Sequence, residues 1–599
     1  MDDNHSTPLL RESWPYDVTE HGLFASRATR DGIERKRIAN FAAWIAAERI
    51  IDDGAERQKF MDIEAEIRGR RVHFTIPVAA FAAMNWPIEH IGVDAVVEPG
   101  FGNKEQVRAA IQYLSGAVSR HHTYAHTGWR KFDAHGWCYL HPNGAISAAG
   151  PISGIDVKLP EALVHYSLPQ SWTREELQAA MRASLQLLDI APDRVTVPLL
   201  GATYRAALGG ADFSLHLAGH TGSGKSELAA LSQQHYGPSM TSRRLPGAWF
   251  STANHLEALA FATKDAVFVI DEFVIEGSAA NRANLQQTFA RLVRGVGNGA
   301  GRGRADKYGR PRSGQPPRGM IISTGEEIPS GQSLRARMLV IQVERNMICG
   351  GDLRALTPLQ EAALSGQYAT AMAGFIHWFA NDFEARQQEF ATEVAIRRKK
   401  APPGAHARTM NIGLQLGAIW QFIAQFALEC GAINEVEAVR YMRRADDAIA
   451  LIGEEQVGIQ AASDPAQRFC ELLSSVVASG RAHIADPNGQ APTNPAAMGW
   501  RKVGINWQPL GFCIGWEDGS GGLFLEPEAS FAAVQAMGDA TDDRLGGGGW
   551  MLRKLLHERG LLLTVETEAG KTHRTIRRTI DGRRRRVLHV PNLLNIPED

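Results

Sequence analysis

The octapeptide that organises this chain is Gly219-His220-Thr221-Gly222-Ser223-Gly224-Lys225-Ser226. An apolar run at residues 213–218 precedes it, and residues 227–231 continue it with helical spacing. A strand, a glycine-rich loop and a helix in this order are the context that a phosphate-binding P-loop requires. The alternative is a chance glycine turn, which does not explain why all three fall in register. The pattern therefore predicts a P-loop.

The residues of the octapeptide predict a site for ATP and Mg²⁺. Its glycines let several backbone N–H groups point at one anion, beside the positive end of a helix. We expect the eight residues to surround the phosphates, with Lys225 reaching the β- and γ-phosphates. The Ser226 hydroxyl would complete the oxygen shell of the Mg²⁺ ion.

Two carboxylates follow a second apolar run. Residues 266–270 are rich in β-branched side chains, which is typical of a strand buried on both faces, and Asp271-Glu272 come directly after them. In P-loop enzymes the carboxyl edge of the parallel sheet faces the nucleotide. We expect Asp271 to hold the Mg²⁺ through water and Glu272 to polarise the attacking water. An ordinary acidic turn is the alternative, and the distance downstream of a P-loop favours ATP hydrolysis.

The composition is that of an ordinary globular protein. Of the 599 residues, 44% are hydrophobic and 22% are charged, and the net charge is −1. A chain of this length should contain about three or four domains. The near-zero charge limits any nucleic-acid contact to local patches. Scattered cysteines, no charged-then-apolar leader and no apolar run of ~20 residues together predict a cytoplasmic protein without a membrane contact.

Changes in pattern along the chain predict an α/β protein with four domains. We expect an N-terminal α+β domain at residues 1–195, a P-loop ATPase core at 196–346, a helical lid at 347–462 and a winged-helix-like domain at 463–599. Within the helical lid, residues 397–404 combine four basic side chains with two prolines and a glycine, and are expected to form an exposed turn.

An aromatic hairpin is expected in the first domain, with residues 133–136 as its turn. Strand alternation would allow His126 and His141 to share one face, which raises a metal site as a hypothesis. No third ligand follows at a recognisable spacing. A packed hairpin with hydrogen-bonded histidines is therefore the favoured interpretation.

Two segments of the chain are strongly basic. The first, at residues 297–319, is threaded with glycine, cannot bury itself and should be a flexible exposed loop. Its candidate DNA-binding residues are Arg302, Arg304, Lys307, Arg310 and Arg312. The second is a C-terminal pair of strands with Arg583, Arg584, Arg585 and Arg586. Helices followed by a basic hairpin favour a DNA-binding winged helix, with a protein-binding wing or dimer contact as the alternative.

Several motifs, in a fixed order, resemble a known family. They are Tyr124-Ala125-His126-Thr127-Gly128-Trp129-Arg130, Tyr139-Leu140-His141, the P-loop, Ser251-Thr252-Ala253-Asn254, Ile270-Asp271-Glu272-Phe273, and Ser323-Thr324-Gly325-Glu326 through Arg335-Ala336-Arg337. Together they resemble the domain-of-unknown-function family nine-two-seven, which is attached to primase-helicases of phages, plasmids and integrated elements. The similarity covers most of the chain.

The resemblance implies an AAA+-type ring helicase, expected as a hexamer, that acts on single-stranded DNA. It implies that Ser323 and Thr324 form a sensor for the attacking water, and that Arg335 or Arg337 is an arginine finger reaching a neighbour's ATP. Arg408, in the helical lid, is a candidate second sensor beside the nucleotide. The basic loop at residues 297–319 would enter the central pore. Many relatives carry a primase domain, for which this chain has no room, so a primase would be a separate partner.

Two other classes of function stay open. An AAA+ switch or anti-phage defence scaffold would sense nucleic acid or a partner without unwinding DNA. A small-molecule kinase is disfavoured, because Glu272 supplies a water-activating carboxylate and the chain carries much additional machinery.

Overall fold

The computed structural model describes two compact units. Unit 1 comprises residues Met1–Ile328 and Arg337–Ile452, and unit 2 comprises Pro329–Ala336 and Gly453–Asp599. The residues described are 12–13, 15–301, 304–305, 311–312, 314–329, 331–401, 407–461, 464–540, 545, 548–563, 565–568, 571–591 and 593–594. Helices and strands occur in both units, which confirms the α/β class. The expected division into four domains stays a prediction.

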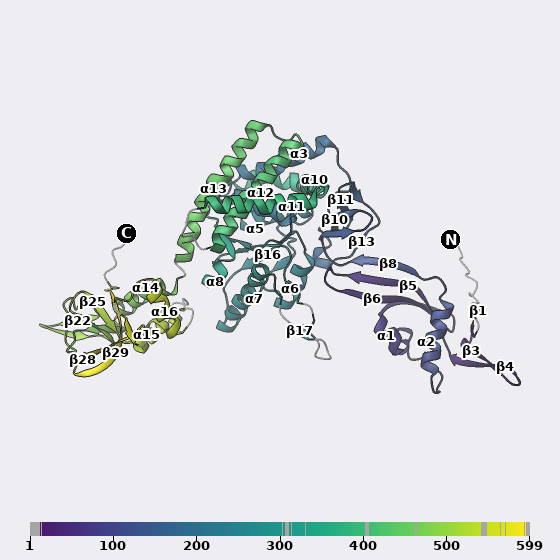
Figure 1. The fold of residues 1–599 in the computed structure, drawn as a ribbon, viewed down its shortest axis with the longest axis horizontal. Helices are drawn as coiled ribbons and strands as arrows, with labels where there is room; N and C mark the ends of the chain where they lie inside the picture. Colours follow the sequence, from purple (N-terminus) through teal and green to yellow (C-terminus); the bar gives the residue numbers. More distant parts are fainter. Residues whose placement is uncertain are drawn as a thin grey trace. The chain divides into compact units, whose positions relative to one another are not determined.

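A five-stranded parallel sheet forms the core of the part of unit 1 that contains the P-loop (Figure 1). In spatial order its strands are β15 (Gly247–Ala248), β16 (Val267–Phe273), β19 (Met320–Gly325), β14 (Ser214–Ala218) and β20 (Met338–Gln342). Their continuous apolar runs bury both faces of the sheet, as expected for parallel strands. Because β19 lies between β14 and β16, it adjoins both the strand that leads to the P-loop and the strand that carries Asp271.

Helices cover both faces of this sheet (Figure 1). On one face, α4 (Asp193–Ala207) packs with α5 (Lys225–Gln233), the helix that continues the P-loop. On the other, α6 (Ala253–Ala262) packs on α7 (Ala279–Asn298). Phe289 of α7 stacks on Trp249 with ring centroids 4.7 Å apart, which fixes α7 against the sheet.

Three antiparallel or mixed sheets precede this core. The first contains β1 (Glu12–Ser13), β2 (Tyr16–Thr19), β3 (Gly22–Thr29) and β4 (Gly32–Ala39); the second contains β13 (Asp156–Val157), β8 (Ser119–Tyr124), β5 (Ala42–Asp52), β6 (Arg57–Ile67) and β7 (Arg70–Pro77). Helix α2 (Asn103–Leu114) buries its apolar face against this region. The third sheet contains β12 (Gly150–Ile152), β11 (Gly144–Ser147), β10 (Gly136–His141) and β9 (Gly128–Phe132). Strands β9 and β10 are antiparallel neighbours, so the predicted aromatic hairpin is present.

The aromatic hairpin is attached to the P-loop core by hydrogen bonds. The Trp129 indole N–H donates to the Ala207 carbonyl at 2.6 Å, and the Trp129 backbone N–H donates to Asp265 Oδ2 at 2.9 Å. The Tyr139 hydroxyl donates to the Asp265 carbonyl at 2.8 Å. These contacts give the hairpin residues a packing role.

Consecutive helices complete unit 1. They are α9 (Thr357–Leu364), α10 (Gln367–Asn381), α11 (Phe383–Lys400), α12 (Ala407–Glu429) and α13 (Glu435–Ala461), the last of which continues into unit 2. The expectation of a turn at residues 397–404 is wrong in its first half, because residues 397–400 form the last turn of α11. Positive charge at a helix C-terminus is favourable, and Arg397 also pairs with Glu393 one turn earlier at 2.7 Å. Residues 402–406 lie outside the described residues.

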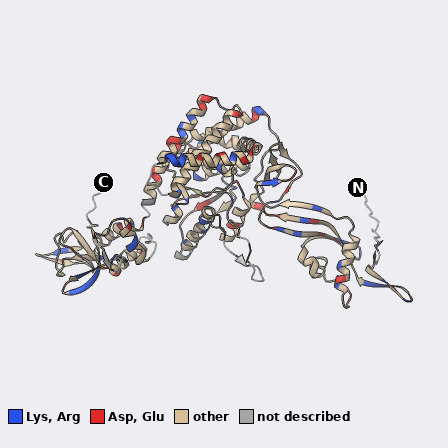
Figure 2. Ribbon diagram, in the orientation of Figure 1, with Lys and Arg blue, Asp and Glu red and all other residues tan. Residues whose placement is uncertain are grey.

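Beyond α13, the described part of unit 2 contains three helices, a sheet of five strands and two two-stranded sheets, β22 (Trp500–Val503) with β23 (Asn506–Pro509) and β26 (Glu566–Glu568) with β27 (Lys571–His573). The helices are α14 (Pro465–Ala478), α15 (Pro527–Ala540) and α16 (Gly549–Glu558). The strands of the five-stranded sheet, in spatial order, are β21 (Ala482–Ala485), β24 (Phe512–Glu517), β25 (Gly522–Leu525), β29 (Arg583–Pro591) and β28 (Ile576–Ile580). Arginine residues gather on the β28–β29 hairpin (Figure 2).

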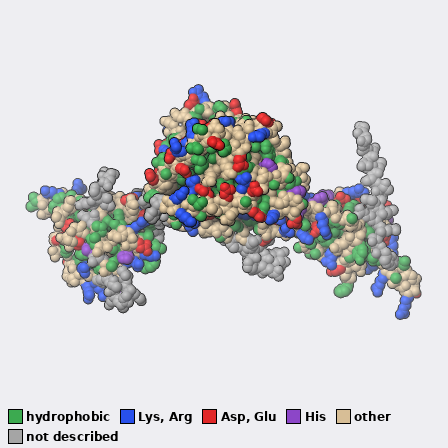
Figure 3. All heavy atoms as spheres, turned by 45° about the horizontal axis from the view of Figure 1, so that its top comes forward, with side chains coloured by type: hydrophobic (Ala, Val, Ile, Leu, Met, Phe, Trp, Pro, Cys, Tyr) green, Lys and Arg blue, Asp and Glu red, His purple; other side chains and the backbone are tan. Residues whose placement is uncertain are grey.

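The surface of unit 1 agrees with its near-neutral composition. Acidic and basic side chains are mixed over the face that Figure 3 displays. Within the described ranges, no helix is both long enough and apolar enough to cross a membrane.

Candidate nucleotide site

The P-loop follows β14 and adopts a conformation that only glycine permits at several positions. Gly222 and Gly224 have φ of 80° and 84°, in the left-handed region. A Cβ on Gly219 would lie 2.0 Å from the Val343 carbonyl oxygen, so the close approach of these two backbones also requires glycine. Helix α5 begins at Lys225, directly after the loop.

Lys225 is folded back onto the loop in this structure. Its Nζ donates to the carbonyls of Gly219 at 2.6 Å and His220 at 2.8 Å. Burial lowers the pKa of Lys225, and the nearby carboxylates of Glu326 and Asp271 oppose that shift. The amine is therefore held among backbone oxygens that an incoming phosphate would replace.

Three oxygen-bearing side chains converge beside the P-loop. The Ser226 hydroxyl donates to Asp271 Oδ1 at 2.9 Å, and the Thr324 hydroxyl donates to the same oxygen. The Glu272 backbone N–H donates to Thr324 Oγ1 at 3.1 Å. No group of three His, Cys, Asp or Glu side chains able to hold a metal occurs in the described part of the chain. Ser226 and Asp271 instead fit the usual Mg²⁺ arrangement of one carboxylate, a hydroxyl and phosphate oxygens.

Glu272 has an unusual backbone for a strand residue. Its φ is 69°, and the pairing of β16 with β19 shifts register between Ile270 and Phe273. A left-handed conformation costs a non-glycine residue about 1–3 kcal/mol and is typical of functional sites. The side chain of Glu272 is exposed and lines the same cavity as the P-loop residues.

Ser323 and Thr324 face opposite sides of β19, and only Thr324 belongs to this site. Ser323 is buried in the core, where its Oγ lies 2.9 Å from the Trp249 indole nitrogen and 3.0 Å from His216 Nδ1. The expected two-residue sensor is thus brought together with the carboxylates through Thr324 alone.

Glu326 is a further residue of the site, and the sequence had suggested no role for it. The Thr221 hydroxyl of the P-loop donates to Glu326 Oε1. This bond, and the positive charge of Lys225, hold the pKa of the Glu326 carboxyl below its usual value. A cavity of about 400 Å³ opens here, and its polar lining is completed by two apolar side chains, Val274 and Leu353.

Arg337 lies at the opposite edge of the parallel sheet. It directly precedes β20, and its carbonyl accepts from the Ser214 N–H at 3.1 Å, so it is level with the start of β14. The P-loop follows the end of β14, five residues away, or ~17 Å along a strand. The Arg337 guanidinium donates to Asn298 Oδ1, at the end of α7, at 3.3 and 3.1 Å.

Two more arginines accompany Arg337. Burial, followed by the positive charges of Arg408 and Arg294, lowers the pKa of Arg337. Helix α12 carries Arg408 in its first turn, and its Gln415 donates to Asp212, just before β14, at 2.6 Å. The structure therefore places Arg408 near Arg337 at this edge, and its expected role as a second sensor stays a prediction.

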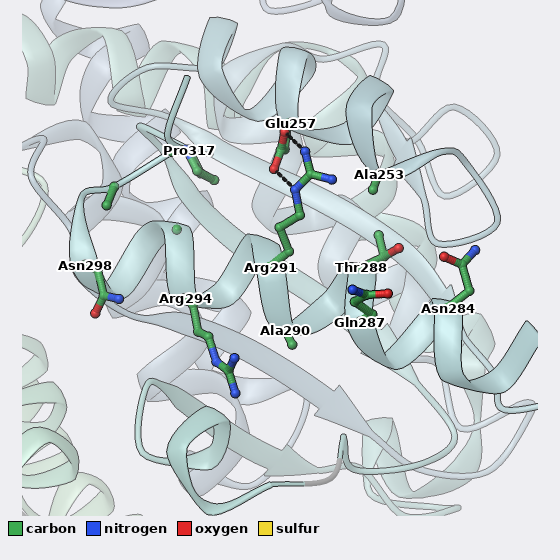
Figure 4. Close-up of a pocket in the computed structure, with 13 residues that line it drawn as sticks. Ala253, Glu257, Asn284, Gln287, Thr288, Ala290, Arg291, Arg294, Asn298 and Pro317 are labelled. Atoms are coloured by element: carbon green, nitrogen blue, oxygen red, sulfur yellow. Dashed lines mark hydrogen bonds and ion pairs between the residues drawn. The ribbon is translucent and has the colours of Figure 1, made fainter. Parts of the chain in front are cut away.

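A polar hollow of about 600 Å³ lies beside the same edge, between α6 and α7 (Figure 4). Arg291 pairs with Glu257 across it, whereas Arg294 extends away from that pair. Asn298, which binds Arg337, also lines the hollow. Arg335 is placed differently, because it donates to the backbone carbonyls of Pro329 at 3.2 Å and Ile459 at 3.0 Å.

The structure describes the basic segments unequally. Arg304 and Arg312 oppose each other in a short hairpin of β17 (Arg304–Ala305) and β18 (Pro311–Arg312), whereas Arg302, Lys307 and Arg310 lie outside the described residues. Arg583, Arg584, Arg585 and Arg586 all lie in β29.

His126 and His141 are not brought together as ligands. His126 Nδ1 lies 2.7 Å from the Thr127 carbonyl oxygen, and His141 Nδ1 accepts from the Leu168 N–H at 3.3 Å. Burial lowers the pKa of each to about 4, so both rings are neutral at pH 7. Their contacts are those of core histidines.

Comparisons with known proteins give a family match for part of the chain and a shared fold for nearly all of it. The profile of the family described as Domain of unknown function (DUF927) matches residues 104–315, and no curated protein matches the chain. A solved structure titled "SCCmec type IV Cch - active helicase" is 13% identical, with a TM-score of 0.55 over 98% of this chain and 99% of that chain. A crystal structure of JCV Helicase bound to an acetamide ligand is 17% identical over 42% of this chain and 69% of that chain, with a TM-score of 0.22. The first likeness shows a shared fold over nearly the whole length, and the second is too weak to argue from. The match over residues 104–315 confirms the resemblance to the DUF927 family for that part of the chain.

Proposed function

We propose that this chain is an ATP-driven DNA helicase or translocase of a mobile genetic element. The observation that carries the proposal is the meeting of Ser226, Asp271, Glu272 and Thr324 beside the P-loop. In this proposal residues 196–346 are an AAA+-type core, α9 to α13 are its helical lid, and unit 2 is a winged-helix-like module. The shared fold with a protein titled an active helicase supports the motor over other ATPases.

Each residue of the site has a definite task in ATP hydrolysis. Lys225 leaves the carbonyls of Gly219 and His220 and neutralises the β- and γ-phosphates. Ser226 and Asp271 would hold Mg²⁺, which when bound neutralises charge on the phosphate oxygens. Glu272 polarises the attacking water and accepts its proton on the carboxylate. Thr324 links the Glu272 backbone to Asp271, so it fixes the distance between the water-activating and cation-binding carboxylates.

The position of Arg337 supports a ring. A guanidinium at the edge of the sheet opposite its own P-loop cannot reach its own γ-phosphate, but it can reach that of a neighbour packed head to tail. Arg337 is accordingly the proposed arginine finger, with Arg294 and Arg408 supplying further positive charge to the same interface. Arg335, fixed to two carbonyls, is assigned a structural role. A hexamer is the expected ring.

Single-stranded DNA is the proposed substrate in the ring, contacted by the β17–β18 hairpin and its flanking basic residues. Phosphate contacts by arginine and lysine do not depend on sequence. A primase, if it acts with this ring, would be a separate protein.

Strand displacement on forked, 3′-tailed and 5′-tailed DNA tests the proposal. The motor predicts ATPase activity stimulated by single-stranded DNA and displacement on at least one substrate. Stimulated hydrolysis without displacement on any of them would instead identify a nucleic-acid-sensing switch. A rate of ATP hydrolysis that does not change when DNA is added would contradict the motor.

A further inference from the structure

Unit 2 contains a cavity that has no part in the proposed ATP hydrolysis. Its volume is about 440 Å³, and it lies between the starts of α15 and α16 on one side and the β28–β29 hairpin on the other. Trp550 of α16 and Arg574 and Arg586 of the strand region line it. A cavity of this size falls within the usual range for small ligands.

The two faces of the β28–β29 hairpin differ in what their arginines contact. Arg577 pairs with Arg586, and Thr579 pairs with Arg584, so Arg577, Arg584 and Arg586 share one face. On the other face, Arg585 lies over the Trp516 ring at 4.8 Å and Arg578 over the Phe524 ring at 6.0 Å. The four consecutive arginines of β29 are therefore not equivalent, and Arg586 is the one that lines the cavity.

Trp550 is the second unusual feature of the cavity. Its side chain is 62% exposed although it is a large aromatic group, and it lies in the first turn of α16. Proteins bind single-stranded nucleic acids with exposed aromatic rings beside arginines, because every base can stack on the ring and every linkage carries a phosphate for the arginines. A paired base within a duplex does not expose its face in this way.

The cavity is lined by three arginines, Arg553, Arg574 and Arg586, against two glutamates, Glu526 and Glu528, so its charge favours an anion. Arg553 donates to Glu528 at 2.9 Å, so its positive charge is largely neutralised by that carboxylate. Arg574 has a buried Nε with no hydrogen-bond partner among the described residues. Arg586 adds a second cation, and Arg577 and Arg584 extend the positive face along the hairpin.

We infer that this cavity binds an unpaired base of a DNA strand. The base stacks on Trp550, Arg574 and Arg586 hold the adjoining phosphates, and the strand continues along Arg584 and Arg577. This rests on the proposed action on DNA and adds to it a specific form of DNA, the single-stranded arm of a fork or tail. Unit 2 would then guide a displaced or loading strand, whereas a simple wing would bind only duplex backbone.

The test compares matched variants of the full chain in a background with Arg304→Ala and Arg312→Ala, which weakens the proposed contact inside the ring. Fluorescein-labelled forked DNA and a blunt duplex of the same sequence are titrated, and anisotropy gives each Kd. Trp550→Ala should weaken fork binding about tenfold and leave duplex binding unchanged. Trp550→Phe should keep the affinity of the parent for forked DNA, because stacking needs only an aromatic ring. Arg586→Gln should weaken fork binding and reduce its salt dependence. Arg585→Gln, on the other face, is the control and should do neither.

Two outcomes would overturn the inference. One is a fork affinity for Trp550→Ala within twofold of its parent, and the other is an equal loss on fork and duplex, which would indicate backbone binding by a wing. A measurement without variants checks the same contact: 2-aminopurine in the unpaired arm should be quenched on binding, and an unquenched signal contradicts stacking. The proposed motor is judged separately by strand displacement with the unmodified chain, so either idea can fail alone.

Discussion

Ser323 and Thr324 are adjacent residues with separate tasks, and this makes them a matched pair for experiment. Thr324→Ala removes the hydroxyl that joins Asp271 to the Glu272 backbone, so ATP turnover should fall by ~10²-fold through loss of positioning. Thr324→Ser keeps the hydroxyl and should keep most of the activity. Ser323→Ala removes the partner of the buried Trp249 indole N–H and of His216 Nδ1, which should lower the free energy of unfolding by about 1–3 kcal/mol.

Steady-state ATPase rates and urea unfolding of the three variants separate the two effects. A Ser323→Ala protein that loses catalysis while keeping its stability would contradict the division of labour.

Glu272 should be needed for hydrolysis and dispensable for binding. Glu272→Gln keeps the size of the side chain but removes the base, so turnover should fall by about 10²–10⁴-fold while ATP and Mg²⁺ still bind. Lys225→Ala is the comparison, since it removes the charge that neutralises the phosphates and should weaken nucleotide binding as well. Binding of a fluorescent ATP analogue, measured beside hydrolysis, distinguishes them. Loss of nucleotide binding in Glu272→Gln would make Glu272 structural.

At the residue level, the sequence predicted the positions of site residues where position follows from local order. The P-loop and Asp271-Glu272 were brought to one cavity because both follow buried parallel strands, whose carboxyl ends share an edge. It could not decide which of Ser323 and Thr324 faces the nucleotide, since alternation says only that they differ. It also could not place Arg408 in space, because that position depends on how α12 packs near the start of β14.

The β17–β18 hairpin is the element through which the motor should contact DNA. Replacing Arg302, Arg304, Lys307, Arg310 and Arg312 by alanine should weaken single-strand binding for all sequences. The slope of log affinity against log salt should flatten by about 0.7 for each lost phosphate contact. Basal ATPase activity should survive, because none of these residues belongs to the P-loop or to the Asp271-Glu272 pair. Stimulation by DNA and strand displacement should disappear, and unchanged unwinding of forked DNA would exclude a role for the hairpin.

Elements were predicted well where hydrophobic spacing is strong and poorly where composition pointed to a break. The strands β14 and β16 follow from the apolar runs at residues 213–218 and 266–270. The basic run at residues 397–400 suggested a turn, yet it ends α11, because positive charges at a helix C-terminus are stabilising. The register shift that gives Glu272 its positive φ has no local signal, since it depends on pairing with β19.

Stability of the whole molecule should depend on pH through buried neutral histidines in unit 1. Burial lowers the pKa of His126, His141, His216 and His235 to about 4 each, whereas an unfolded histidine titrates near 6.5. Between these values the unfolded chain binds more protons than the folded one, so stability rises with pH and is lost as pH falls from about 6.5 towards 4. Each histidine contributes a slope of up to about 1.4 kcal/mol per pH unit.

Urea unfolding at several pH values should show this trend in the free energy of unfolding, and His141→Asn should make the slope smaller. A free energy of unfolding that does not change with pH would contradict the burial of neutral histidines.

Assembly of the ring is tested by mixing two inactive proteins. Arg337→Ala should bind ATP normally but lose about 10³–10⁵-fold in hydrolysis, since a guanidinium on the γ-phosphate supplies that much. Lys225→Ala should be inactive because its own P-loop is damaged, although its Arg337 is intact. In mixed rings the intact P-loop of the first variant can meet the intact Arg337 of the second, so part of the activity should return and should peak at an intermediate ratio.

The matched pair Glu272→Gln with Lys225→Ala is the control: both substitutions damage a chain's own nucleotide site, so no interface in that mixture is complete. Recovery in the first mixture and none in the second would place Arg337 in trans, as its position at the edge opposite its own P-loop requires. No recovery at any ratio, with subunits shown to exchange, would mean that this edge does not meet a neighbour's nucleotide.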